Sequence, residues 1–424
     1  MSELDGFETR FAVAYRRYLD EAPTDVDPAS VARTVAAAQV RARSLAWPWA
    51  LRPAPELAWL VRLALLLASL SAALLFVGSQ QQRQLPAVMP AFACPPGSTP
   101  DAPGPVDQAR PPSGSAMAFD RAFGKIVLVG LPEGGGAVET WTFDVCTNTW
   151  TRMRPASEPY FGFMGMLAYD TAARQTISVF PARQAWAYDL ASDTWTMRAD
   201  ALNVRGVRLA YDSAVARVVA LQVGSPHRMW SFDGVADAWE PVEQDQDVWP
   251  VPSDSTDPQP LLAYDASVDR LVSYYQGDVR LFDLRTGTWS PPGTTSPPFG
   301  YGGGYYSLGG EIAYDEAAQR TVLFNMGYVI AYDAAADRWE TLYGPAVDGC
   351  GVRPECRNLH SMVYDPVNER LVVYGGHVHT GAVDPGWWGP SDDVLAFDTR
   401  TREWTVLLEA SQPVSPVVSS SPGP

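Results

Sequence analysis

Side chains suited to acid–base or metal chemistry are scarce in this 424-residue chain, which has four histidines and four cysteines. His377 and His379 alternate along one extended stretch and His360 lies shortly before them, which would allow a metal site. The cysteines lack the two-residue spacing of a zinc site, and no nucleophile stands in a recognisable pattern with a base. The sequence therefore predicts no metal and no cofactor, and enzyme activity is the minority interpretation.

Aspartate recurs at regular intervals, always after an aromatic residue. A first set of such pairs ends at Asp120, Asp170, Asp212, Asp265, Asp315 and Asp365, and a second set at Asp144, Asp189, Asp233, Asp283, Asp333 and Asp398. Each aspartate belongs to a separate turn without a cluster of neighbouring oxygens, so calcium binding is not expected. The predicted role of these carboxylates is to accept backbone N–H groups within the turn.

Aromatic residues in irregular stretches are the candidates for ligand binding. An aromatic plate beside polar groups suits a sugar ring or a peptide side chain, whereas the alternative is that these residues pack the loops onto the scaffold. The predicted binding residues are Tyr160, Trp249, Tyr305, Tyr306, Trp387 and Trp388.

The elements that carry these residues follow from the repeats. Five residues after each aspartate of the first set comes a basic residue, or Gln175, followed by an apolar β-branched run. Six residues after each aspartate of the second set stands a tryptophan, predicted to pack against the adjacent unit: Trp150, Trp195, Trp239, Trp289, Trp339 and Trp404. Each unit reads as four strands, a to d, and six such units over 113–408 predict an all-β fold, a six-bladed β-propeller.

This topology sorts the connections into two sets. The a–b and c–d turns form a short-turn face, and the b–c and d–a connections form a loop face. The loop face comprises the long stretches 154–165, 241–260, 290–310, 344–358 and 377–393, and it carries all six candidate binding residues.

The repeats resemble those of kelch propellers, most closely in the sixth unit. There His360-Ser361 opens strand a, Gly375-Gly376 follows strand b, and Phe397-Asp398 to Trp404 completes the unit. His360 occupies a position where kelch units often carry a packing histidine. Other units lack the double glycine, so the resemblance implies the fold more strongly than any ligand.

A membrane anchor is predicted before the repeats. Residues 57–77 are apolar except for Arg62 and are long enough to span a bilayer once as a helix. Arginines gather on their N-terminal side, which predicts a cytoplasmic segment at 1–56 and an extracytoplasmic propeller on a single-pass membrane protein. The remaining stretches are predicted to be a Pro/Gly-rich linker at 78–112 and a disordered tail at 409–424.

Cysteine usage agrees with this topology, because all four cysteines follow the apolar stretch. Cys350 and Cys356, six residues apart, are a candidate disulfide, and Cys94 with Cys146 is the combination that remains. The sequence does not decide between these pairings and free thiols.

Before the anchor, two short amphipathic α-helices are predicted within 1–56. This segment is loosely similar to the leaders of bacterial anti-sigma-type regulators, which implies a cytoplasmic signalling partner. The alternative is a simple anchor segment with one helix on the membrane surface.

Net charge narrows the choice of partners. The formal charge of −17 repels phosphate backbones, so nucleic-acid binding is not expected. The leading hypothesis is a membrane-anchored bacterial kelch-type propeller that binds a protein or carbohydrate ligand outside the cytoplasm. The alternatives are a tethered enzyme acting on glycans and a transmembrane regulator of the anti-sigma type.

Overall fold

The computed structural model describes residues 92–112, 116–132, 137–159, 166–180, 184–198, 207–222, 229–245, 260–275, 277–295, 297, 310–344, 356–380 and 387–411. The predicted cytoplasmic segment, membrane helix and most of the tail lie outside these residues. Within them, no helix is long and apolar enough to cross a membrane.

The described chain forms six four-stranded antiparallel sheets, each built from the a, b, c and d strands of one repeat. The first three sheets are β1 (Ala116–Asp120), β2 (Lys125–Gly130), β3 (Glu139–Asp144) and β4 (Thr149–Arg152); β5 (Met166–Asp170), β6 (Gln175–Phe180), β7 (Gln184–Asp189) and β8 (Thr194–Met197); and β9 (Val207–Asp212), β10 (Arg217–Gln222), β11 (Met229–Asp233) and β12 (Ala238–Val242). The others are β13 (Leu261–Asp265), β14 (Arg270–Tyr275), β15 (Asp278–Asp283) and β16 (Thr288–Trp289); β17 (Glu311–Asp315), β18 (Arg320–Asn325), β19 (Tyr328–Asp333) and β20 (Arg338–Tyr343); and β22 (Ser361–Asp365), β23 (Arg370–Tyr374), β26 (Val394–Asp398) and β27 (Glu403–Leu408).

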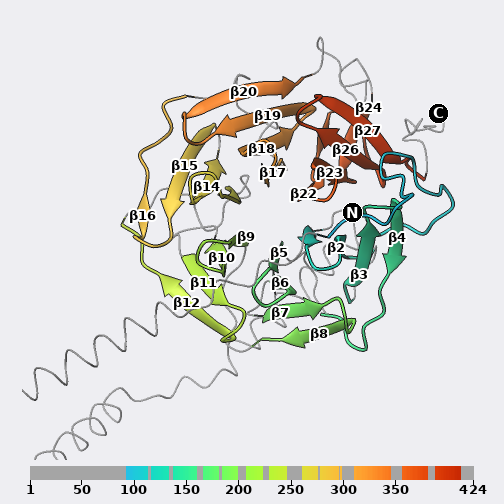
Figure 1. The fold of residues 1–424 in the computed structure, drawn as a ribbon, viewed down its shortest axis with the longest axis horizontal. Coiled ribbons are helices and arrows are strands. Elements are labelled where there is room, and N and C mark those ends of the chain that lie inside the picture. Colours follow the sequence, from blue (N-terminus) through green and yellow to red (C-terminus); the bar gives the residue numbers. More distant parts are fainter. Residues whose placement is uncertain are drawn as a thin grey trace, which may run out of the picture. The chain divides into compact units, whose positions relative to one another are not determined.

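These sheets follow one another around a ring, with strand a innermost (Figure 1). Each a strand contacts the a strands of both neighbouring sheets, and β22 of the sixth sheet contacts β1 of the first. Apolar side chains fill every junction between neighbouring sheets, including the junction of the first with the sixth. The architecture is consistent with a β-propeller, whose core is divided among the junctions.

Twelve turns of one geometry join strands a to b and c to d. In each, the Oδ1 atom of the recurrent aspartate accepts a backbone N–H two or three residues later, at 2.8 to 3.0 Å. The residue four positions after the aspartate has a left-handed backbone, with φ between 46° and 70°, and only Gly124 and Gly287 are glycines there. The expected structural role of the aspartates is confirmed.

The basic residue that opens strand b lies opposite the first aspartate in the backbone register, as predicted. Its ion pair, however, goes mainly to the third strand of the sheet. Lys125 pairs with Asp144 at 3.6 Å and Arg217 with Asp233 at 2.8 Å. Arg370 of the sixth sheet differs, with Nε 3.3 Å from Asp365.

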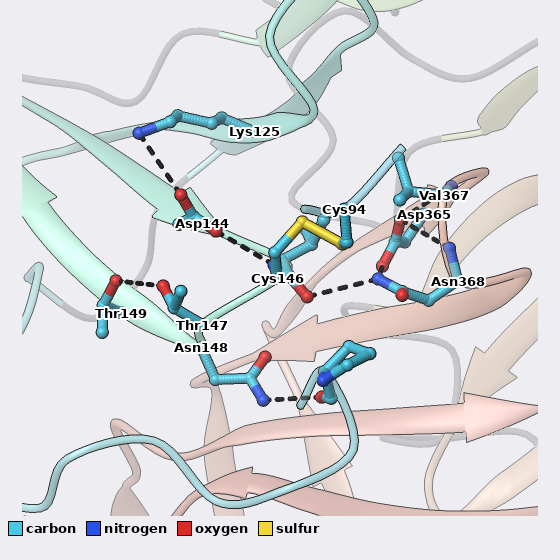
Figure 2. Close-up of a disulfide and its surroundings, with 12 residues drawn as sticks. Cys94, Lys125, Asp144, Cys146, Thr147, Asn148, Thr149, Asp365, Val367 and Asn368 are labelled. Atoms are coloured by element: carbon cyan, nitrogen blue, oxygen red, sulfur yellow. Dashed lines mark hydrogen bonds and ion pairs between the residues drawn. A yellow bond between two sulfur atoms is a disulfide. The ribbon is translucent and has the colours of Figure 1, made fainter. Parts of the chain in front are cut away.

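A strap formed by residues 92–112 joins the first sheet to the sixth (Figure 2). A disulfide links Cys94 in the strap to Cys146 in the turn between β3 and β4. The N–H of Gly104 donates to Leu407 O at 2.8 Å on β27, and the hydroxyl of Tyr374 on β23 donates to Pro111 O at 2.6 Å. The second half of the predicted linker is therefore attached to both the first and the sixth sheet.

Candidate functional site

The aromatic candidates for binding fall mostly outside the described residues, which is the case for Tyr160, Trp249, Tyr305 and Tyr306. The backbones of Trp387 and Trp388 are described, and they lie in a strand that the sequence did not predict. The candidate site is therefore the part of the loop face that belongs to the sixth sheet.

This part of the loop face holds a further three-stranded sheet, in which β24 (His377–Thr380) pairs with both β21 (Arg357–Asn358) and β25 (Trp387–Pro390). The backbone register sets Trp388 opposite His379 and Trp387 opposite Thr380. The predicted irregular loop between strands b and c is thus an antiparallel hairpin at its two ends. The structure brings the two histidines and the two tryptophans of the sequence analysis onto this one hairpin.

A buried ion pair holds the hairpin on the ring. Arg357 is fully buried, and its Nη1 and Nη2 atoms donate to Asp393 Oδ1 and Oδ2, each at 2.9 Å. Nη1 also donates to Gly375 O at 3.0 Å, and the Ser391 hydroxyl donates to Asp393 Oδ1 at 2.7 Å. A bidentate ion pair with these added hydrogen bonds fixes the position of β21 relative to the segment that follows β25. Removing one partner would leave a buried charge uncompensated.

The double glycine has a local reason at this site. Gly375 and Gly376 have φ values of 65° and 93°, where a side chain causes strain. A Cβ at Gly376 would also lie 2.6 Å from Asn358 O on β21. The two glycines therefore let the chain turn sharply from β23 into β24 and pass close to β21.

His360 is a packing residue of this region. It is 2% exposed, and its ring lies 4.6 Å from that of Phe324 between ring centroids. Burial, reinforced by the positive charge of Arg357, lowers the pKa of His360 to about 3. The imidazole is neutral at physiological pH, and the described residues hold no cluster of three or more potential metal ligands around it.

The six recurrent tryptophans lie where strand d packs on strand c. Each ring centroid is 4.7 to 5.0 Å from the aromatic ring of the preceding strand. Trp150 also lies 5.0 Å from Tyr374 and Trp404 lies 5.1 Å from Phe324, both in the neighbouring sheet. Trp150, Trp195 and Trp289 are buried, whereas Trp239, Trp339 and Trp404 are partly buried. These residues stabilise the junctions between sheets.

Three of the four cysteines lie in the described part of the chain. Cys94 and Cys146 form one disulfide, and Cys356, at the start of the segment that leads into β21, is also disulfide-bonded. Cys350 lies outside the described residues, so its pairing with Cys356 stays a prediction.

A cavity of about 490 Å³ opens on the opposite, short-turn side, between the fifth and sixth sheets. Arg320 and Arg402, which line it, both pair with Glu340. Arg400 and Asp398 also lie on its wall and pair with each other at 3.6 Å. Because its charges compensate one another, this cavity shows no preference for an anion or a cation.

Two features of the site escaped sequence analysis. The hairpin did so because its strands are short and separated by residues rich in glycine, and Arg357 did so because it lies outside the repeats. The sixth unit combines Arg357, 18 residues before the double glycine, with the Asp392-Asp393 pair, and this combination is the sequence signal that could have indicated the ion pair.

Comparison with known proteins does not assign this chain to a family. The sequence matches no protein-family model and no curated protein. Among solved structures it is similar to a protein of unknown function from Bacteroides thetaiotaomicron VPI-5482, with 13% identity and a TM-score of 0.46 over 67% of this chain and 72% of that one. It is also similar to a chain of a nidogen/laminin complex, with 11% identity and a TM-score of 0.40 over 55% of this chain and 80% of that one. Similarities of this degree say nothing about what the chain binds.

Proposed function

We propose that this chain is a membrane-anchored, six-bladed kelch-type propeller that binds a protein or carbohydrate ligand through its loop face. The observation that carries the proposal is the β24–β25 hairpin, which Arg357 and Asp393 hold on the ring by a buried bidentate pair. Such a pair gives little net stability compared with apolar packing, so its use here favours a role in positioning the hairpin. A rigidly held loop on a regular scaffold is typical of a binding surface.

The β24–β25 hairpin has an exposed and a buried side next to its tryptophans. His377 and Pro390, which face each other, are exposed, whereas Val378 and Gly389 are buried. We assign ligand contact to Trp387 and Trp388, the two predicted binding residues of this hairpin.

The charge of the loop face indicates which class of ligand it binds. The crossing from the third to the fourth sheet is acidic and has no basic residue over 240–260, its carboxylates being Glu240, Glu243, Asp245, Asp247, Asp254 and Asp257. An acidic face attracts neutral or cationic ligands and repels polyanions. Together with the aromatic residues predicted to bind on the same face, this charge suits neutral sugars or basic peptides.

The test is a glycan and peptide array probed with residues 85–424, which form one compact unit of the chain. For whichever probe binds, Trp388→Ala should weaken binding at least about tenfold while leaving the melting temperature unchanged, because no described side chain of the hairpin takes part in the apolar junctions between the six sheets. Phe123→Ala, which removes an exposed aromatic residue from the short-turn face, is the matched control and should leave binding unchanged. Equal binding by the Trp388→Ala protein, or tight binding of a nucleic acid, would contradict the proposal.

The membrane anchor is tested separately. A reporter fused after Pro424 should be active outside the cytoplasm, because the arginines that precede residues 57–77 stay inside. Activity of that fusion in the cytoplasm would refute the proposed orientation.

A further inference from the structure

An ion pair lies at the centre of the ring, at its loop-face end. The residue four positions before the first aspartate of each repeat lies at the start of each a strand, and these six residues are Ala116, Met166, Arg208, Leu261, Glu311 and Ser361. Only Arg208 and Glu311 carry a charge. The other four are small or apolar, apart from the hydroxyl of Ser361.

The position of Arg208 follows from its contacts. Its Nη1 atom is 3.6 Å from Glu311 Oε1 in the fifth sheet and 3.6 Å from Met166 Sδ in the second sheet. The second and fifth sheets lie opposite each other in the ring (Figure 1). A guanidinium from the third sheet that reaches both of them must lie near the ring's axis.

The side chains of Arg208 and Glu311 are largely buried, but their hydrogen-bonding capacity is not fully used. Burial raises the pKa of Glu311, and the positive charge of Arg208 opposes that rise. The separation of 3.6 Å exceeds a hydrogen-bond length, and within the described part of the chain the Glu311 carboxylate accepts no hydrogen bond. The Arg208 and Glu311 side chains keep 18% and 24% of their exposure, so each has hydrogen-bonding capacity that reaches solvent.

We propose that Arg208 and Glu311 form a binding site for a free α-amino acid, with its carboxylate on Arg208 and its ammonium group on Glu311. A guanidinium receives a carboxylate through two parallel hydrogen bonds, and a carboxylate accepts the three donors of an ammonium group. The two charges of an α-amino acid are about as far apart as those of the protein's ion pair, so both new contacts form together. An amino acid also leaves the enclosed site neutral.

Simpler ligands fit this site less well. A carboxylic acid without an amine would draw Arg208 away and leave Glu311 enclosed without a counter-charge, and an amine would do the reverse to Arg208. Leaving one charge unpaired in an enclosed site is costly. The site lies on the axis and uses none of the loop tryptophans, so it extends beyond the proposed function and does not depend on it.

The experiment measures thermal unfolding of the full-length protein with each common α-amino acid at millimolar concentration, followed by calorimetry. At least one amino acid should raise the melting temperature and bind, while its N-acetyl and carboxamide derivatives, which each lack one charge, should not. Arg208→Met and Glu311→Gln should each weaken binding at least about tenfold.

Arg121→Met is the matched control. Arg121 pairs with Glu316 of the fifth sheet at the short-turn end of the same ring, so this variant removes a comparable ion pair and should bind the amino acid normally. If a single variant fails to fold, the exchange of Arg208→Glu with Glu311→Arg keeps the pair and should bind in the reversed orientation. The proposal is overturned if no amino acid binds, if both derivatives bind as tightly as the parent, or if a folded exchange variant does not bind. Normal amino-acid binding by the Trp388→Ala protein would separate this site from the loop-face site.

Discussion

Loss of the Cys94–Cys146 disulfide should destabilise the closed ring more than any single loop substitution. Every four-stranded sheet of the described chain takes all its strands from one repeat, so no strand is shared between the first and last sheets. Their junction depends on apolar packing, on the hydrogen bonds of the turns and on the strap of residues 92–112. The double variant Cys94→Ser with Cys146→Ser removes only the covalent part of that attachment.

The size of the effect follows from the loop that the bond closes. The two cysteines are 52 residues apart, and a cross-link over that separation lowers the entropy of the unfolded chain by an amount worth about 4 kcal/mol at 25 °C. For a unit of this size, that loss corresponds to a fall in the melting temperature of about 6 °C. The hydrogen bonds of Asn148 to Pro100 O and Ala102 O stay available to the variant, so it should still fold.

Differential scanning calorimetry of the wild type and the variant, each with and without reductant, provides the measurement. The two proteins should differ without reductant and become nearly equal with it, since the disulfide at Cys356 is reduced in both. Hydrogen exchange should quicken first in β1 and β22, which meet at the junction. A fall of less than about 1 °C, or exchange that quickens equally in all sheets, would refute the assignment of the strap as the closure of the ring.

Three further outcomes are expected. Trp289, which is 5% exposed and lies 4.8 Å from Phe282, should cost about 3–5 kcal/mol of unfolding free energy when changed to alanine, as measured by denaturant titration; a loss below about 1 kcal/mol would contradict its burial at the junction. Ala216 has a φ of 55°, so Ala216→Gly should stabilise the protein by about 0.5–1 kcal/mol, and a destabilised variant would mean that this turn is not left-handed. Burial raises the pKa of Asp120 to about 6 from its ordinary 3.8, so its contribution to stability decreases as pH rises from about 4 to 6 and stays low above that. Asp120→Asn keeps an acceptor for the Ala122 N–H and should therefore gain up to about 3 kcal/mol relative to the wild type at pH 8 compared with pH 4; a difference that does not change with pH would contradict the raised pKa.

The fold was predictable because its determinants are local and repeated. An aspartate that accepts a backbone N–H two residues later needs only its own turn, and the tryptophan six residues after each aspartate of the second set packs on the strand just before it. Both signals therefore survive in every repeat, and the register of Asp212 opposite Arg217 is the one their spacing predicts. The left-handed residue four positions after each aspartate was not predictable, because ten of the twelve are not glycine and the turn imposes the conformation.

The candidate site was predictable only in its location. Counting strands assigns the long connections to one face, and Trp387 and Trp388 to one of those connections. The pairing of Arg357 with Asp393, 36 residues apart, has no periodic signal, because each residue occurs once and outside the repeats. Without that pair the connection reads as an irregular loop.

The sequence alone determines the order of the strands, the capped turns and the packing of each tryptophan on its own sheet, since these depend on residues a few positions apart. The tertiary structure decides which residues meet once the ring is closed. Arg208 and Glu311 are 103 residues apart and lie in sheets that are not neighbours, yet ring closure brings them within 3.6 Å. Likewise, Cys94 reaches Cys146 only because the strap crosses between the sixth and the first sheet. Contacts across a closed ring depend on the summed geometry of all the sheets, and no short stretch of sequence contains that information.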